Sequence, residues 1–106
     1  MKHYSPRTWK KALLSGDYKR GKDQLKNRGK YCCLGVYRDM VGGPEINADV
    51  YLRESAPPWL SKKDQYDLAN RNDVKEQGPG WDPDGPVIEY IDTVIIPAYD
   101  RARKAK

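Results

Sequence analysis

The apolar stretch at residues 93–98 has only six residues, and no other apolar stretch in the chain is much longer. A helix that spans a membrane needs about 18 to 20, so we expect no transmembrane segment. The chain has 106 residues, of which 38% are hydrophobic and 33% charged, and it contains 3 Trp and 8 Tyr. Disordered chains are poor in aromatic and large aliphatic residues. The sequence therefore predicts a single small domain, residues 1–106, with a modest core.

Apolar residues that recur every three or four positions predict about four short helices. The first is expected over residues 6–15, with Trp9 and Leu13 on its inner face. The second is expected within residues 31–41, the third over 61–72, and the last from Pro86 onward. The third helix has few apolar residues, so it must gain stability from packing against the others.

Residues that start and stop helices support these boundaries. Ser5 stands before a proline, and Ser61 stands three residues before an aspartate, so both are typical helix starts. Gly16 follows the first helix and suits a left-handed C-terminal conformation, and the run Gly-Gly-Pro at residues 42–44 stops the second. Pro97 predicts that the last helix either kinks or restarts.

The segments between the helices predict little regular structure. Residues 17–30 are polar and basic, and we expect a long loop or a short irregular hairpin that turns at residues 27–29. Residues 49–53 alternate like a strand, residues 74–86 form a loop of turns, and the basic tail at 101–106 frays. The predicted fold class is α+β and mainly helical, with about four short helices, at most a small hairpin and long turn-rich loops.

Charge is distributed unevenly along the chain. The formal net charge is +5, but residues 1–38 carry +9, residues 39–100 carry −8 and residues 101–106 carry +4. The basic part includes a loop in which cations alternate with aromatic residues, a composition that suits phosphate contact and base stacking. The predicted anion-binding residues are Tyr18, Lys19, Arg20, Lys22, Lys26, Arg28, Lys30 and Tyr31. Two alternatives stay open: the loop lies against the acidic half of the molecule, or it is simply solvated.

A nucleotide-binding loop is a weaker interpretation of this region. Gly16, Gly21 and Lys22 match the first seven positions of the phosphate-cradling pattern GxxxxGK[ST]. Asp23 stands where the pattern needs a hydroxyl to hold magnesium, and the required preceding strand and following helix are reversed. We interpret the segment as a helix end followed by a basic loop.

The remaining chemistry-bearing residues predict no catalytic set, no metal and no cofactor. Cys32 and Cys33 are adjacent, so they cannot close an ordinary disulfide loop, and the distant His3 does not give them zinc-binding spacing. We expect two thiols, with Cys33 in the core and Cys32 at a second contact. An enzyme would need carboxylates such as Asp82 and Glu89 to converge with a tyrosine or lysine.

One short motif gives a family resemblance. The run Tyr-Cys-Cys-Leu-Gly-Val occupies residues 31–36, and further landmarks extend over residues 9–73. Together they resemble a family of small uncharacterised proteins common in tailed phages and prophages, although Arg38 stands where members often have a third cysteine. The resemblance implies phage origin and brings no established activity. Its landmarks are expected to form a packing skeleton: Trp9, Leu13, Gly16, Gly21, Cys33 and Val36.

These observations favour a small non-enzymatic phage accessory protein. It would bind an anionic ligand or a host protein during host takeover or counter-defence. Two alternatives are a direct nucleic-acid-binding protein and a sponge for a nucleotide second messenger. The expected location is the cytoplasm of the host cell, away from membranes, and the apolar last helix suits self-association.

Overall fold

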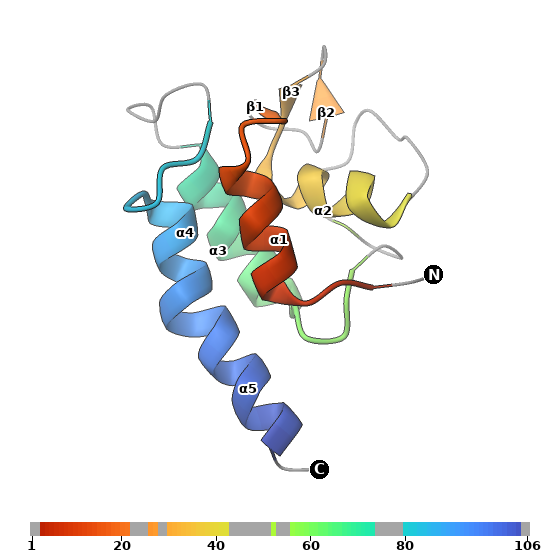
Figure 1. Cartoon of the computed structure of the whole chain (residues 1–106), viewed down its shortest axis with the longest axis vertical. Helices are drawn as coiled ribbons and strands as arrows, with labels where there is room; N and C mark the ends of the chain where they lie inside the picture. The colour runs from red at the N-terminus through yellow and green to blue at the C-terminus, as the bar shows by residue number, and fades with distance from the viewer. Residues whose placement is uncertain are drawn as a thin grey trace.

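The computed structural model describes residues 3–21, 26–27, 30–42, 52, 56–73 and 80–104, with the backbone alone at residues 26–27 and 30. Helices dominate it, and three very short strands lie at one end (Figure 1). In chain order the elements are α1 (Pro6–Leu14), β1 (Lys19–Arg20), β2 (Lys26–Asn27), β3 (Lys30–Tyr31), α2 (Cys33–Val41), α3 (Lys62–Asn72), α4 (Pro86–Tyr90), η2 (Ile91–Ile95) and α5 (Ile96–Lys104). The predicted mainly helical α+β class is confirmed.

α1 begins and ends where its sequence predicts. The hydroxyl oxygen of Ser5 accepts a hydrogen bond from the backbone N–H of Thr8 at 3.2 Å, which satisfies one of the free amides of the first turn. Gly16 follows the helix with a φ of 85°, a conformation that side chains with a Cβ rarely adopt. Trp9 and Leu13 are buried on the inner face.

α2 ends and α3 begins at predicted residues. Gly42 takes a φ of 72° as the C-cap of α2. At the start of α3, the Ser61 hydroxyl accepts from the N–H of Asp64, and the Asp64 carboxylate accepts from the N–H of Ser61. This reciprocal capping box compensates for the few apolar residues of α3.

The last helix is one continuous rod with an irregular middle. α4 opens at Pro86 as predicted, η2 is a π-helical turn, and α5 continues from it. Pro97 has no N–H, and in a regular α-helix its ring would clash with the carbonyl of Thr93. The wider η2 turn immediately before it accommodates the ring, so the helix continues rather than restarting. The helix also extends through Lys104, into the basic tail that we expected to fray.

The strands form a three-stranded sheet in the order β1-β3-β2. β2 and β3 are antiparallel, as in the hairpin predicted around residues 27–29. β1 pairs with β3 in parallel, which the sequence did not predict, and it places Lys19 opposite Lys30 and Arg20 opposite Tyr31. The sheet therefore brings together cations that are separated by a loop in the sequence.

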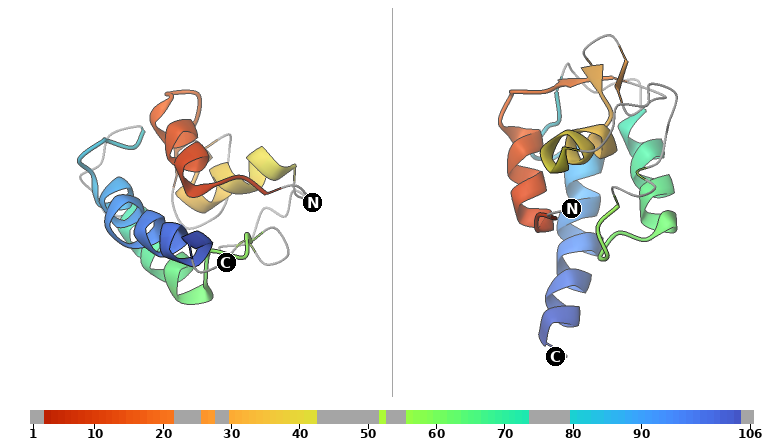
Figure 2. Two further views of the ribbon diagram at one scale, coloured as in Figure 1. Left: turned by 60° about the horizontal axis from the view of Figure 1, so that its bottom comes forward. Right: turned by 90° about the vertical axis from the view of Figure 1, so that its right-hand side faces the viewer.

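The core lies where α1, α2, α3 and the α4–η2 rod meet (Figures 1 and 2). An aromatic cluster joins the elements: the Trp9 ring packs edge-on against Tyr37, and Trp59 contacts both. α5 extends past this core at the end opposite the strands (Figure 1) and has no buried residue. The largest fully buried side chains include Trp9, Tyr37, Leu13, Leu34, Leu68, Ile88 and Ile91.

Two sequence predictions fall mostly outside the described residues. Of the strand expected at 49–53, only Leu52 is described, and it is buried without regular secondary structure. Of the turn-rich loop at 74–86, the structure describes residues 80–86, where Gly85 donates its N–H to the carbonyl of Asp82 at 2.9 Å. Among the described helices, none combines the length and apolar character that crossing a membrane requires.

Candidate functional site

The predicted basic loop is only partly described. Lys22 and Arg28 lie outside the described residues, and Lys26 and Lys30 are described by their backbone in β2 and β3. Lys19 is exposed on β1. With Arg20, also on β1, the described part of the loop thus places four cation-bearing positions on adjacent strands.

The two tyrosines of the predicted site contact each other. The rings of Tyr18 and Tyr31 meet edge to face, with centroids 5.0 Å apart. The Tyr18 hydroxyl donates to the Asp39 carboxylate of α2 at 2.6 Å. Burial, followed by this carboxylate, raises the pKa of Tyr18 well above its usual value. The acidic half of the sequence therefore holds at least one member of the predicted binding residues.

Arg20 is also held from within the molecule. Its guanidinium donates to the backbone carbonyl of Asn72 at 2.7 Å, at the C-terminal end of α3. Arginine side chains are favourable at this end of a helix, where the last carbonyls have no helical partner. Arg20 consequently anchors β1 to α3, and this contact reduces its freedom to bind a ligand.

Asn72 joins four parts of the chain, and sequence reasoning missed this role. Its side chain is fully buried. Oδ1 accepts from the backbone N–H of Cys33 at 3.1 Å and from the indole N–H of Trp81 at 2.9 Å. Nδ2 donates to the carbonyl of Gly21 at 2.8 Å and to the Asp73 carboxylate at 3.3 Å. The amide thus uses both acceptor and both donor positions.

Both cysteines are buried free thiols. Cys32 is the N-cap of α2, and its sulfur accepts weakly from the N–H of Gly35 at 3.4 Å. Burial raises the pKa of Cys32 to about 11 and that of Cys33 well above its usual value. Thiols that stay protonated and covered are poor nucleophiles.

Four residues of the expected packing skeleton lie at the junction of α1 and α2. Trp9, Leu13, Cys33 and Val36 are all buried. The indole N–H of Trp9 donates to the carbonyl of Cys33 at 2.9 Å, and this bond links the two helices directly. Gly16 has the left-handed conformation described above. The buried N–H of Gly21 donates to the carbonyl of Tyr31 at 2.6 Å and continues the β1–β3 pairing.

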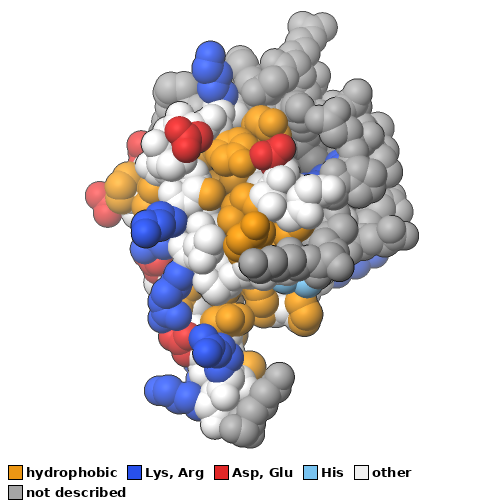
Figure 3. Space-filling view, turned by 45° about the vertical axis from the view of Figure 1, so that its right-hand side comes forward, with side chains coloured by type: hydrophobic (Ala, Val, Ile, Leu, Met, Phe, Trp, Pro, Cys, Tyr) orange, Lys and Arg blue, Asp and Glu red, His pale blue; other side chains and the backbone are white. Residues whose placement is uncertain are grey.

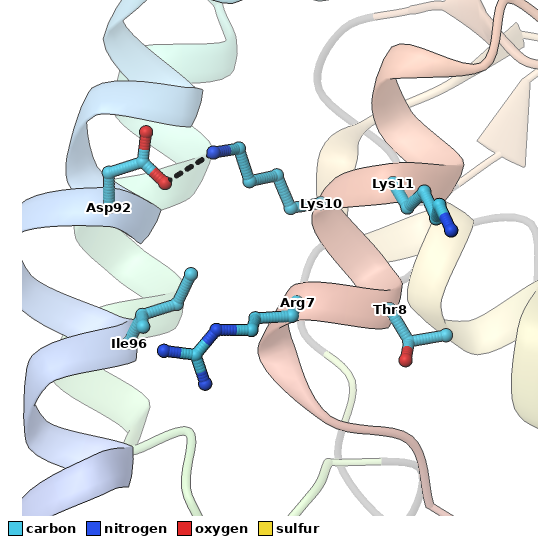
Figure 4. Close-up of a pocket in the computed structure, with 6 residues that line it drawn as sticks. All are labelled: Arg7, Thr8, Lys10, Lys11, Asp92 and Ile96. Carbon is cyan, nitrogen blue, oxygen red and sulfur yellow. Dashed lines mark ion pairs between the residues drawn. The ribbon is translucent and has the colours of Figure 1, made fainter.

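A second basic surface, which the sequence analysis did not single out, lies between α1 and the η2–α5 helix. We call it the α1–α5 basic face and define it by its five cations, Arg7, Lys10, Lys11, Arg103 and Lys104. An open groove of about 630 Å³ runs between the helices (Figure 4). In Figure 3, blue Lys and Arg side chains follow each other from the left-hand middle of the view to the projecting lower end.

Two ion pairs cross this groove. Lys10 Nζ lies 2.7 Å from the Asp92 carboxylate, as the dashed line in Figure 4 marks. Arg7 forms a two-pronged contact with Asp100, at 2.9 and 2.6 Å. The hydrogen bond from Arg7 lowers the pKa of Asp100, and the positive charges of Lys104 and Arg103 lower it further. Arg103 and Lys104 follow Asp100 by three and four positions on α5, so they lie on the same side of that helix.

The acidic side chains on the opposite side of the α4 helix have partners of their own. The Tyr90 hydroxyl lies 2.9 Å from an Asp64 oxygen and 3.1 Å from an Asp67 oxygen. The Arg71 guanidinium lies over the Tyr90 ring and 3.6 Å from Glu89. Asp82 and Asp84 are exposed in the turn before α4. Within the described residues, no group of three His, Cys, Asp or Glu could hold a metal ion.

The local signal for the α1–α5 basic face was present in the sequence but incomplete. On α1, the three cations lie away from the buried Trp9 and Leu13, as helical spacing predicts. Their neighbours on α5 are about ninety residues further along, and only the folded chain shows that the two helices contact each other.

Comparison with known proteins gives one match. No curated protein and no solved structure matches the chain. A family described as "Domain of unknown function (DUF8296)" matches residues 1–82, which include α1, the sheet, α2 and α3 and stop before α4. Because this match covers most of its length, the chain belongs to the DUF8296 family.

Proposed function

We propose that this chain is a small non-enzymatic accessory protein of phage origin that binds an anionic ligand through the α1–α5 basic face. The resemblance of residues 31–36 to a phage family supports the origin. The observation that carries the binding function is an open groove lined by three cations of α1, Arg7, Lys10 and Lys11, with Arg103 and Lys104 following further along α5.

The charge balance of this face favours anions. Its five cations face two carboxylates, Asp92 and Asp100, so a net charge of +3 remains. Both ion pairs are partly exposed: the Arg7 side chain is 56% and the Asp92 side chain 41% accessible. Exposed pairs contribute only about 0 to 1 kcal/mol, so an incoming anion can replace a carboxylate at low cost.

The thiols, the imidazole of His3 and two tyrosine hydroxyls, which are groups often used in catalysis, are buried or form contacts within the protein. This supports a binding role. The thiols of Cys32 and Cys33 are buried and have raised pKa values. The His3 ring stacks on Tyr37, with its Nδ1 3.0 Å from the Tyr37 hydroxyl. Tyr18 and Tyr90 are hydrogen-bonded to aspartates.

Retention on a heparin column tests the proposal, with the salt concentration at elution as the measurement. Lys11→Glu should elute at clearly lower salt than the unmodified chain, because it reverses one charge of the face. Lys62→Glu is the matched control, since Lys62 is exposed at the start of α3 and the net-charge change is the same. Lys19→Glu shows whether the predicted loop contributes to binding.

Two outcomes would contradict this function. Equal elution of Lys11→Glu and Lys62→Glu would show that only net charge matters and that the face is no binding site. Turnover of a nucleotide or oligonucleotide, lost on changing a specific side chain, would contradict the non-enzymatic role.

A further inference from the structure

We propose that the α1–α5 basic face binds the phosphodiester backbone of a nucleic-acid duplex. This inference rests on the proposed function, because it names the ligand class for the same surface. It is carried by the shape, the length and the charge of the face.

The shape of the groove is unsuited to a small ligand. Sites for small molecules are concave and bury about 70 to 90% of the ligand surface. Here the groove is open along its length, and Lys11 projects along the outer side of α1 rather than into an enclosed space (Figure 4). A free nucleotide would keep most of its surface in water, whereas a long rigid polyanion can lie across both helices.

The length of the face matches several phosphates in a row. The rod from the level of Asp92 to Lys104 includes twelve residue steps, or about 18 Å at the rise of an α-helix. Successive phosphates of one duplex strand advance about 3.4 Å along the axis, so the face spans about five of them. Cations occur at both ends of this length, with Lys10 near Asp92 and Lys104 near Asp100.

The two ion pairs hold cations in place for the incoming phosphates. Arg7 already presents its planar guanidinium to two oxygens of Asp100, at 2.9 and 2.6 Å. A phosphate offers oxygens in a similar fork, so it can replace this carboxylate with little rearrangement of the arginine. Lys10 can exchange Asp92 for a phosphate in the same way.

The aromatic residue of α5, Tyr99, favours a duplex over a single strand. Single-strand binders add affinity by stacking bases on aromatic rings. Tyr99 of α5 instead packs edge-on against Trp59, with ring centroids 6.1 Å apart, and Arg103 lies 5.6 Å from its ring centre. The described residues of this face therefore offer contacts to the phosphates of a nucleic acid rather than stacking with its bases. A duplex supplies a denser and more rigid row of phosphates than a single strand does.

Fluorescence anisotropy tests the inference with three probes: a labelled duplex of about 20 base pairs, one of its single strands, and a heparin fragment. The duplex should bind more tightly than the single strand and with little dependence on sequence. A plot of log affinity against log salt should have a slope of about −4.5, since each of five phosphate contacts contributes about −0.9.

Variants locate the binding site. Lys11→Ala combined with Arg103→Ala should make the slope less steep by about 2, because two contacts are lost. Lys62→Ala should leave it unchanged, and circular dichroism verifies that each variant is folded. A lower affinity in the Lys19→Ala variant with no effect of the double variant would move the site to the sheet and overturn the inference.

The probes also separate failure of this inference from failure of the proposed function. Heparin binding without duplex binding, or tighter binding of the single strand, would overturn the duplex inference and leave an anion-binding face in place. If none of the three probes bound, both would fall.

Discussion

Replacing Asn72 with alanine should remove a large part of the stability of this domain. The substitution leaves two buried donors, the N–H of Cys33 and the indole N–H of Trp81, without their acceptor. It also leaves the carbonyl of Gly21, a buried residue, without the donor Nδ2. Each unsatisfied buried group costs about 1 to 3 kcal/mol, and partial relaxation gives about 3 to 6 kcal/mol for the three.

The expected total stability puts this loss in proportion. The free energy of unfolding of a domain of this length is about 5 to 15 kcal/mol, so Asn72→Ala should remove about half of it. At about 4 to 8 °C per kcal/mol, the melting temperature should fall by at least about 12 °C. Urea unfolding followed by tryptophan fluorescence measures the free energy, and circular dichroism follows the melting.

The matched control is Asn70→Ala, because Asn70 is exposed on the same helix. Its effect should be a few tenths of a kcal/mol, as for ordinary surface changes. A loss below about 1 kcal/mol for Asn72→Ala, similar to that of the control, would refute the reasoning, because it would mean that water replaces the amide without cost.

Asn72→Asp gives an independent test of the same network. The new carboxyl keeps the shape but, when ionised, cannot donate to the Gly21 carbonyl, and burial raises its pKa above that of the unfolded chain. The folded state then binds a proton more tightly than the unfolded state, so stability is greater at low pH and is lost as pH rises. The variant should be less impaired at pH 4 than at pH 8.

Three further results are expected from the structure. Ser61→Ala should lower the free energy of unfolding by about 1 kcal/mol in urea titrations, because it removes the capping box of α3. Tyr18→Phe should reduce the loss of stability above about pH 10, because the raised pKa of Tyr18 favours the folded state only while the phenol is protonated; an unchanged slope of stability against pH would contradict this. Ellman's reagent should react slowly with the folded chain and rapidly with both thiols after unfolding, since the buried Cys32 has a pKa of about 11; rapid reaction of the folded chain would show that the thiols are accessible.

Local signals in the sequence predicted the helices well. The hydroxyls of Ser5 and Ser61 bond to amides within three residues, and Gly42 adopts its left-handed conformation at the end of its own helix. Such contacts depend on neighbours in the sequence, so a pattern of a few residues is enough to predict them.

Contacts between distant segments could not be predicted in the same way. The parallel pairing of β1 with β3 links residues that are 11 positions apart in the sequence. Three of the four side-chain hydrogen bonds of Asn72 link residues that are 9 to 51 positions apart, and the fourth is to its neighbour Asp73. An asparagine near the end of a polar helix resembles a surface residue in sequence. Only the positions of Cys33 and Trp81 in the folded chain show what its amide satisfies.

The binding surface shows the same limit. The density of cations around Lys19 and Arg20 drew attention to one loop, yet Arg20 anchors the loop to α3. Arg7 and Asp100 are 93 residues apart, and their contact assembles a basic face that neither helix suggests alone. The sequence shows how charges follow one another along the chain, whereas a ligand contacts charges that are neighbours on the folded surface.

The π-helical turn η2 also determines in which direction around the helix axis the side chains of α5 project. An α-helix rotates about 100° per residue, and a π-helical turn contains about one residue more than an α-helical one. If the same residues Ile91–Ile95 wound as a regular α-helix, they would turn further around the axis by up to about one residue's rotation of 100°, and Asp100 and Lys104 would swing away from Arg7. A related chain could retain every cation of α5 and still lack the basic face if its last helix had no such turn.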